Sequence, residues 1–388
     1  MLSLLLAIIY LAFISLGLPD SLLGSAWPVM YKELNVPISY AGIVSMIIAG
    51  GTIISSLLSD RLTKKFGAGI VTVISVLMTA VALFGFSLSK FFFVICLWAI
   101  PYGLGAGAVD AALNNYVALH YSSRHMSWLH CFWGIGASVS PYLMGFALTK
   151  KFGWESGYRF VGIIQIIITA ILFLSLPLWK NRKQESKENQ NKKAIRLVAA
   201  VKIKGVKLIL VTFFAYCAFE TSAGLWASSF LVQGRGINPE TAATFASLFY
   251  LGITLGRFLN GFIADKIHDR NLIRIGLGVI ILGVVFILLP FDILTLSGLV
   301  IAGLGCAPIY PSIIHSTPEN FGKENSQAII GLQMAGAYVG TTFMPPLFGL
   351  IASKISIGLY PVYLSLLLIL MIAASERFNR KVPLKEAT

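Results

Sequence analysis

The segment Ser56-Leu-Leu-Ser-Asp-Arg-Leu-Thr-Lys-Lys-Phe66 is a charged stretch between two long apolar runs. A similar stretch, Gly261-Phe-Ile-Ala-Asp-Lys-Ile-His-Asp-Arg270, occurs in the second half of the chain. In both, an acid is followed directly by a base, and further bases come within a few residues. Charge of this kind between bilayer-length segments is expected at a membrane face, where the side chains reach water. The repetition of this charged stretch indicates that the chain contains two copies of one structural unit. We call the two stretches the first and second charged hinges.

The composition is that of a membrane protein. Hydrophobic residues make up 57% of the 388 residues and charged residues only 12%, whereas soluble domains carry about 25% charged residues. The formal net charge is +14, but the Lys and Arg residues fall between apolar runs and form no basic patch. We therefore expect a lipid bilayer as the partner of this surface, and no nucleic acid. The first apolar run lacks a basic start and a cleavage pattern, which predicts a retained span.

The apolar runs predict the fold class. A helix needs roughly 20 residues to cross about 30 Å of hydrocarbon, and we find twelve suitable runs. They predict an all-α integral membrane protein with twelve transmembrane helices in two pseudo-symmetric six-helix halves. The runs cover residues 4–30, 37–58, 68–88, 91–118, 127–148, 158–178, 207–232, 241–264, 272–290, 293–314, 326–352 and 356–374.

A polar segment around residues 181–193 separates the sixth run from the seventh. Its composition predicts a linker. We therefore expect an N-terminal half at 1–179, a cytoplasmic linker at 180–204, a C-terminal half at 205–376 and a cytoplasmic tail at 377–388. When loops are assigned alternately to the two sides, most of the 30 Lys and Arg residues fall on the side of the linker and hinges. By the positive-inside rule, both termini of this predicted plasma-membrane protein are cytoplasmic. The opposite side receives Lys32, Lys90, Lys150, Lys151, Arg159, Arg235 and Lys354.

The duplication can be followed from span to span. The aligned pairs are Asp20 with Glu220, Gly51 with Gly256, Asp60 with Asp265, Gly103 with Gly303, Gly136 with Gly340 and Pro141 with Pro345. Repeated halves of this kind pack about an axis along the membrane normal and place a substrate site near the midplane. Glycines in these runs are expected to let helices pack closely. No Gly-Lys-Ser/Thr follows them, so we expect no nucleotide site, and energy must come from an ion gradient or from the solute itself.

The hinges resemble the signature of the major facilitator superfamily, Gly-x-x-x-Asp-Arg/Lys-x-Gly-Arg/Lys-Arg/Lys. The first hinge matches it at Asp60, Arg61, Lys64 and Lys65, with Ser56 and Thr63 in place of the glycines. The second matches it at Gly261, Asp265, Lys266 and Arg270, with His268 and Asp269 as departures. The resemblance covers the whole chain. It implies a secondary transporter that works by alternating access, and not an enzyme.

The fourth run is similar to a narrower group, the L-fucose/proton symporters and their sodium-glucose relatives. It reads Gly103-Leu-Gly-Ala-Gly-Ala-Val-Asp-Ala-Ala-Leu-Asn-Asn-Tyr-Val117, with a membrane acid, Asp110, and Asn114 four residues later. Asp110 stands where the fucose transporter has Glu, and Asn115 where it has Pro. In that group this acid and an aspartate of the first helix take part in proton coupling. The resemblance implies that role for Asp110 and Asp20.

The residues themselves point to the same acids. An ionised side chain deep in a span costs several kcal/mol, so such acids tend to mark ion or substrate paths. Asp20, Asp110 and Glu220 are the three that stand out, and a carboxyl group in an apolar surrounding can exchange a proton near neutral pH. The alternative for each acid is a structural hydrogen bond to a neighbouring helix.

Uncharged polar and aromatic side chains in the spans fit a neutral solute. Sugars bind through fixed donors and acceptors and an aromatic face. The alternative to substrate binding is anchoring at the membrane interface for the tryptophans and packing between helices for His130. The candidate substrate-binding residues are Trp27, Asn114, Asn115, His130, Trp133, Trp226, Tyr310 and Gln333.

The hinge residues are candidates for gating. Their acids and bases can form ion pairs across the two halves and hold the cytoplasmic side shut. Arg257 lies within a span, and we expect it to reach the cytoplasmic face or to pair with the hinge acids. The gating candidates are Asp60, Arg61, Lys64, Arg257, Gly261, Asp265 and Lys266.

The sequence therefore predicts a proton-coupled importer of a neutral sugar or sugar-like solute, acting as a monomer, with Na⁺ possible in place of H⁺. One alternative is a proton-coupled exporter of hydrophobic or cationic compounds. A second is a non-transporting sensor or a lipid-handling protein on the same scaffold. The cysteines, at 96, 131, 217 and 306, lie in four different runs without metal-ligand spacing. We expect buried thiols there, and no metal or cofactor.

Overall fold

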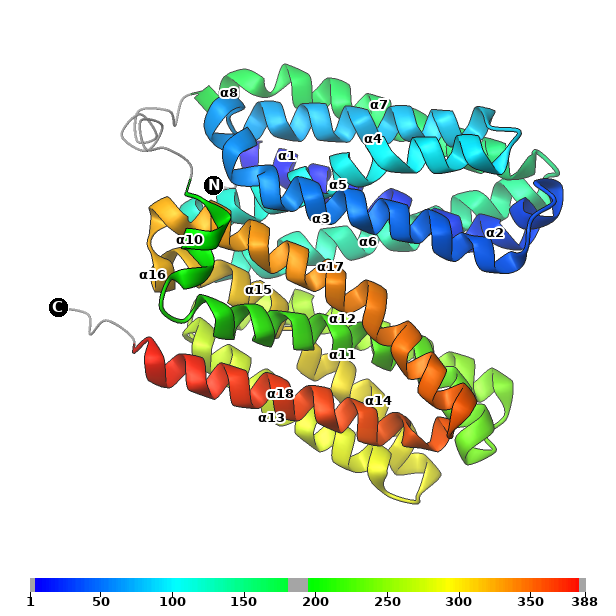
Figure 1. Ribbon diagram of the computed structural model, residues 1–388, viewed down its shortest axis with the longest axis vertical. Helices are drawn as coiled ribbons and strands as arrows, with labels where there is room; N and C mark the ends of the chain where they lie inside the picture. Colours follow the sequence, from blue (N-terminus) through cyan, green and yellow to red (C-terminus); the bar gives the residue numbers. More distant parts are fainter. Residues whose placement is uncertain (1–3, 181–194, 384–388) are drawn as a thin grey trace. The chain divides into compact units, whose positions relative to one another are not determined.

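The computed structural model describes residues 4–180 and 195–383, and within these ranges every regular element is a helix (Figure 1). Most of the predicted linker and the end of the predicted tail lie outside the described residues. The described part of the linker region contains a short helix, α10 (Leu197–Lys202). The last helix continues to Lys381, past the predicted start of the tail.

Within the described residues, twelve stretches of helix are long and apolar enough to cross a membrane. This confirms the predicted number of spans and the all-α membrane fold. They are Leu4–Glu33, Ala41–Phe66, Ala68–Leu88, Phe92–His120, Ser123–Thr149, Gly153–Leu174, Val206–Gly234, Thr244–Ile263, Asp269–Leu288, Asp292–His315, Lys323–Lys354 and Ile357–Lys381.

The chain forms two compact units. The first contains residues up to 116 together with 129–195. Within it, α4 packs along α7 (Figure 1). Its helices are α1 (Leu4–Asp20), α2 (Leu22–Glu33), the 3-10 helix η1 (Ile38–Tyr40), α3 (Ala41–Phe66), α4 (Ala68–Leu88), most of α5 (Phe92–His120), most of α6 (Ser123–Thr149), α7 (Gly153–Leu174) and α8 (Leu176–Lys180).

The second unit contains residues 117–128 together with those from 196 onward. Residues 117–128 join α5 to α6, and we call them the α5–α6 connection. In this unit α13 packs along α14, and α11 along α17 and α18 (Figure 1). The helices that follow α10 are α11 (Val206–Ser229), the π-helix η2 (Phe230–Gly234), α12 (Pro239–Ile263), α13 (Asp269–Leu288), α14 (Asp292–Cys306), α15 (Ile309–His315), α16 (Thr317–Phe321), α17 (Lys323–Lys354), the 3-10 helix η3 (Ile357–Leu359) and α18 (Tyr360–Lys381).

Two of the spans are interrupted next to a proline. Pro19 lies in the last turn of α1, and the helix stops one residue later at Asp20. Pro308 follows the end of α14, and α15 begins at the next residue. Proline removes one helical hydrogen bond and its ring clashes with the preceding turn. At both places the span continues as two helices. The first break places Asp20 at a helix end inside a span.

Glycines set the same helix crossings in both units. A Cβ on Gly136 would lie 2.1 Å from the carbonyl oxygen of Ile14, where α6 crosses α1. The aligned Gly340 approaches the carbonyl of Phe214 in the same way, at 2.8 Å, where α17 crosses α11. Neither crossing has room for a larger side chain, which confirms the close-packing role predicted for Gly136.

The crossing of α3 with α5 is likewise repeated as the crossing of α12 with α14. A Cβ on Gly103 would lie 2.2 Å from the carbonyl oxygen of Ile48, and one on Gly303 would lie 2.2 Å from that of Phe249. The aligned glycines of the sequence therefore occupy equivalent contacts, and the two units share a packing scheme.

Candidate functional site

Asp20 is held by two aromatic donors. The indole Nε1–H of Trp133 on α6 donates to one carboxylate oxygen at 2.9 Å, and the hydroxyl of Tyr102 on α5 donates to the other at 3.2 Å. Asp20 itself is exposed, while Tyr102 is buried. The acid therefore stands at the end of α1, and donors from two neighbouring helices hold it.

Asp110 begins a chain of hydrogen bonds through buried side chains. The amide nitrogen of Asn114 donates to the Asp110 carboxylate at 2.8 Å, one turn away on α5. The amide oxygen of Asn114 is 3.1 Å from Nε2 of His130 on α6. Because an amide oxygen can only accept, Nε2 of His130 carries the hydrogen in this arrangement. Three of the predicted residues are thus brought together.

The hydrogen-bonded groups around Asp20 and around Asp110 both include residues of α5 and α6. His130 and Trp133 are three residues apart on α6, and residues with this spacing lie on one helix face. Tyr102 and Asp110 lie about 12 Å apart along α5, which is roughly two turns. Residues of α5 and α6 therefore contact Asp20 directly, whereas α6 is linked to Asp110 through Asn114.

In the second unit, Glu220 belongs to a buried ion pair. Its carboxylate is 3.3 Å from a terminal nitrogen of Arg257 on α12, and the hydroxyl of Tyr216 also donates to it. The Arg257 side chain is 6% exposed and that of Glu220 is 20% exposed. The ring of Tyr310 lies 5.8 Å from the guanidinium carbon. Within the described residues, Nε of Arg257 has no hydrogen-bond partner.

The hinge acid expected as the partner of Arg257 is wrong. We expected it to reach the cytoplasmic face or to pair with a hinge acid, but it pairs with Glu220 inside the unit. The side chain turns toward α11, where a carboxylate and an aromatic ring offset the cost of burying its charge. Sequence spacing along α12 could not reveal this partner, because it comes from another helix.

The remaining predicted substrate residues are spread over several contacts. Trp27 is buried edge-on against Phe92. Asn115 is buried beside Asn114 on α5. Trp226 donates to the carbonyl of Pro345 at 2.9 Å, which fixes it against α17.

Tyr310 and Gln333 lie in the second unit. The hydroxyl of Tyr310 is 3.3 Å from the sulfur of Met334. Gln333 accepts from Thr317 at 3.1 Å, and its amide nitrogen has no partner within the described residues. Only Tyr310 of these two lies against the Glu220–Arg257 pair.

The first hinge is held within its own helix. Asp60 is buried and lies 3.0 Å from Nζ of Lys64, one turn later on α3. We expected an ion pair to the other half; the pair found among the described residues is with Lys64 on the same helix. Ser56, which replaces a signature glycine, donates to the carbonyl of Gly107 at 3.2 Å. Arg61 is exposed.

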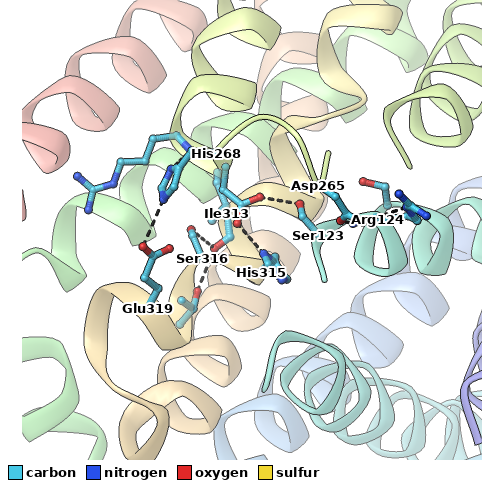
Figure 2. Close-up of polar contacts among 12 residues, drawn as sticks. Ser123, Arg124, Asp265, His268, Ile313, His315, Ser316 and Glu319 are labelled. Carbon is cyan, nitrogen blue, oxygen red and sulfur yellow. Dashed lines mark hydrogen bonds and ion pairs between the residues drawn. The ribbon is translucent and has the colours of Figure 1, made fainter. Parts of the chain in front are cut away.

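The second hinge holds the beginning of α6. Asp265 lies 3.0 Å from the guanidinium of Arg124 and accepts from the Arg124 backbone N–H at 3.1 Å (Figure 2). This N–H belongs to the first helical turn, where an anion is favourable. Gly261 leaves room for Trp128, since a Cβ there would lie 2.1 Å from the indole nitrogen. Lys266 is exposed.

Several side chains that contact the candidate acids or the second hinge were not predicted from the sequence. Tyr216 precedes Glu220 by one helical turn, so the i, i+4 spacing could have indicated it. Tyr102 carried no such signal for Asp20, because the two are far apart in sequence. The polar contacts of Ser123 and His315 near the second hinge (Figure 2) also had no local signal.

Twelve spans in repeated sets, with acids held inside the spans, are the features of a multi-pass membrane transporter. The family model of the Major Facilitator Superfamily matches residues 9–297 and, in a second match, residues 208–386, so the chain belongs to this family. The family consists of transporters and not enzymes.

Two curated relatives illustrate the range of the family. The glucose/mannose transporter GlcP of Bacillus subtilis (strain 168) is 24% identical over 314 residues, covering 78% of this chain and 77% of the relative. The cis,cis-muconate transport protein of Acinetobacter baylyi is 26% identical over 371 residues, covering 90% of this chain and 87% of the relative. The crystal structure of FucP in the outward conformation has a TM-score of 0.76 at 15% identity, covering 97% of this chain and 99% of that one. This last likeness establishes the fold.

Proposed function

We propose that this chain imports a neutral sugar or sugar-like solute together with protons, by alternating access in the plasma membrane. The observation that carries the proposal is Asp20, an exposed acid inside a span that is held by Trp133 and Tyr102. The name of the glucose/mannose relative supports the class of solute.

Protonation of Asp20 would change its surroundings directly. An ionised carboxylate accepts at both oxygens, as it does here from an indole and a phenol. A protonated carboxyl group donates from one of its oxygens. The hydroxyl of Tyr102 can accept this hydrogen, but the indole N–H of Trp133 can only donate, so a proton on the oxygen that Trp133 binds would break that contact. Trp133 offers a flat face to a sugar ring, and its orientation would then depend on the proton. This links proton uptake to solute binding through one side chain.

Asp110 provides a second proton site in the proposed mechanism. Asn114 joins it to His130 within a buried network. A change in the charge of Asp110 alters the hydrogen bond that Asn114 makes, and therefore the position of His130. We assign Asp110 to coupling, with Asn114, Asn115 and His130 as contacts for solute hydroxyls.

In the second unit we assign Glu220 to coupling and Tyr310, Trp226 and Gln333 to solute contacts. Trp27 completes the proposed set in the first unit. The hinge residues act in gating, and in this topology both hinges and both termini face the cytoplasm.

A second candidate is the import of an organic acid, and Arg257 favours it. Its Nε–H has no partner within the described residues, and only one contact of 3.3 Å joins the guanidinium to Glu220. If Glu220 takes up a proton, the buried cation lacks a counter-charge, and a solute carboxylate would supply one. The muconate transport relative supports this candidate.

Uptake into proteoliposomes under an inward proton gradient tests both candidates. We expect the wild type to accumulate a radiolabelled sugar from a panel of glucose, mannose, fucose and xylose, and to lose accumulation when the gradient is collapsed. Asp20→Asn should abolish gradient-driven accumulation but keep sugar exchange across the membrane, because the neutral amide can still bind Trp133 or Tyr102.

Asp292→Asn is the matched control, because Asp292 is an exposed acid in the first turn of α14. It should accumulate sugar like the wild type. Normal accumulation by the Asp20→Asn protein would reject the coupling role. Accumulation of muconate but of no sugar would replace the first candidate by the second.

A further inference from the structure

The α5–α6 connection is bound to α13 and α15 by one network (Figure 2). Ser123 donates to Oδ1 of Asp269 at 2.6 Å, and Oδ2 of the same carboxylate is 2.6 Å from Nδ1 of His315. The other ring nitrogen of His315, Nε2, is 3.1 Å from the carbonyl oxygen of Tyr121. The His315 side chain is 21% exposed and that of Asp269 is 6% exposed. All four residues belong to the second unit.

Both ring nitrogens of His315 therefore face acceptors. A backbone carbonyl can only accept, so Nε2 must carry a hydrogen to bind Tyr121. The carboxylate of Asp269 accepts as well, so Nδ1 must also carry one. A neutral imidazole has a single N–H and can make only one of these two bonds. The network is complete only when His315 is an imidazolium cation.

We propose that His315 is a proton-sensing latch that secures the α5–α6 connection to α13 and α15 when it is protonated. On losing a proton, the imidazole keeps its bond to Asp269, because a hydrogen bond to a carboxylate is stronger than one to a neutral carbonyl. The bond to Tyr121 is the one lost. Histidine exchanges its proton between about pH 5 and pH 8, so the latch loosens as the pH rises through this range.

The charged groups around His315 fit this assignment. Asp269 on α13 and Glu319 on α16 place negative charge near the ring. Asp265 and Arg124 neutralise each other at the start of α6. On the connection itself, His125 lies with its ring edge-on to Tyr121, at 5.7 Å between ring centroids.

His268 is a natural comparison, because it also pairs with a carboxylate. Its Nε2 is 3.3 Å from Glu319, but its Nδ1 accepts from the backbone N–H of Arg270 at 3.2 Å. One nitrogen donates and the other accepts, so the neutral ring satisfies both contacts. His268 therefore needs no positive charge to satisfy its contacts, in contrast to His315; both side chains are drawn in Figure 2.

The latch has a consequence for transport in the proposed topology, in which this end of the helices faces the cytoplasm. Protons that enter with the solute acidify that side, protonate His315 and tighten the connection. The latch would then slow further turnover. This regulatory role rests on the proposed direction of proton flow, whereas the latch itself depends on no particular cargo.

Hydrogen–deuterium exchange of the purified full chain tests the latch without any solute. Exchange of peptides from the α5–α6 connection is compared at about pH 6 and about pH 8, with the intrinsic effect of pH on exchange removed. We expect protection in the wild type to fall about tenfold at the higher pH, since one hydrogen bond to a charged donor is lost. His315→Gln should show low protection at both pH values.

His268→Gln and His125→Gln are the matched controls, and both should keep the wild-type response to pH. Unchanged protection of α4 and α7 shows that a variant is folded. A wild type whose connection is equally protected at both pH values would overturn the proposal, and this result needs no variant. A full pH response in His315→Gln would also overturn it. Neither result bears on whether the protein imports a sugar.

Discussion

At the scale of single residues, the Glu220–Arg257 pair shows what burial does to charge. Arg257 is nearly inaccessible and Glu220 is its one acidic contact in the described structure. Removing one partner of such a pair leaves the other charge uncompensated, whereas removing both leaves none. The pair is therefore expected to behave as a unit in mutagenesis.

We expect Glu220→Gln to lower the free energy of unfolding by about 3 kcal/mol, because Arg257 then lacks its counter-charge. The double variant Glu220→Gln/Arg257→Met should recover much of this loss. Thermal unfolding of the purified protein in detergent measures both effects. Glu319→Gln is the control, since Glu319 is 55% exposed and its pair with His268 contributes little. A double variant less stable than the single one would contradict this account.

At the scale of helices, the glycines at the crossings determine how closely two helices approach. Gly136 and Gly145 both lie on α6, yet only Gly136 faces the backbone of a neighbouring helix. Gly340 and Gly336 on α17 form the corresponding pair, since nothing lies within 4 Å of a Cβ built on Gly336. The chain thus provides its own controls in both units.

We expect Gly136→Ala to destabilise the protein by about 1–3 kcal/mol, because the methyl group would force α1 and α6 apart. Gly145→Ala should be neutral or slightly stabilising, since alanine favours a helix by up to about 1 kcal/mol over glycine. The same contrast should appear between Gly340→Ala and Gly336→Ala. The unfolding temperatures of the four variants measure this contrast. Equal temperatures within each pair would show that the helix crossings tolerate the added methyl group.

At the scale of the whole molecule, the distribution of Lys and Arg gives a prediction of orientation. Lys90 lies between α4 and α5, and Lys266 lies between α12 and α13. Both are exposed. Alternating the sides of the loops places Lys90 outside the cell and Lys266 inside it.

Labelling with a membrane-impermeant maleimide checks this orientation in intact cells. Lys90→Cys should react directly, and Lys266→Cys should react only after the membrane is permeabilised. The wild type, with its four cysteines in the spans, gives the background. Direct labelling at position 266 would reverse the proposed topology.

Much of the fold could be predicted from the sequence. The twelve spans follow from apolar length, since the cost of placing a segment in a bilayer is a sum over its own residues. The repeat follows from aligned residues such as Gly136 and Gly340. The acids Asp20, Asp110 and Glu220 stand out because charge is rare in spans. The i, i+4 relation of Asp110 to Asn114 also follows from helical spacing alone.

Only the tertiary structure decided which side chains meet those acids. Trp133 reaches Asp20 from 113 residues away, and Tyr121 meets His315 from 194 residues away. Such partners depend on how each helix is rotated and how closely it approaches its neighbour, and periodicity within one helix contains no information about either. The charged hinges therefore identified the class of molecule from sequence. The contacts of Asp20, Arg257 and His315 became visible only when the helices were packed together.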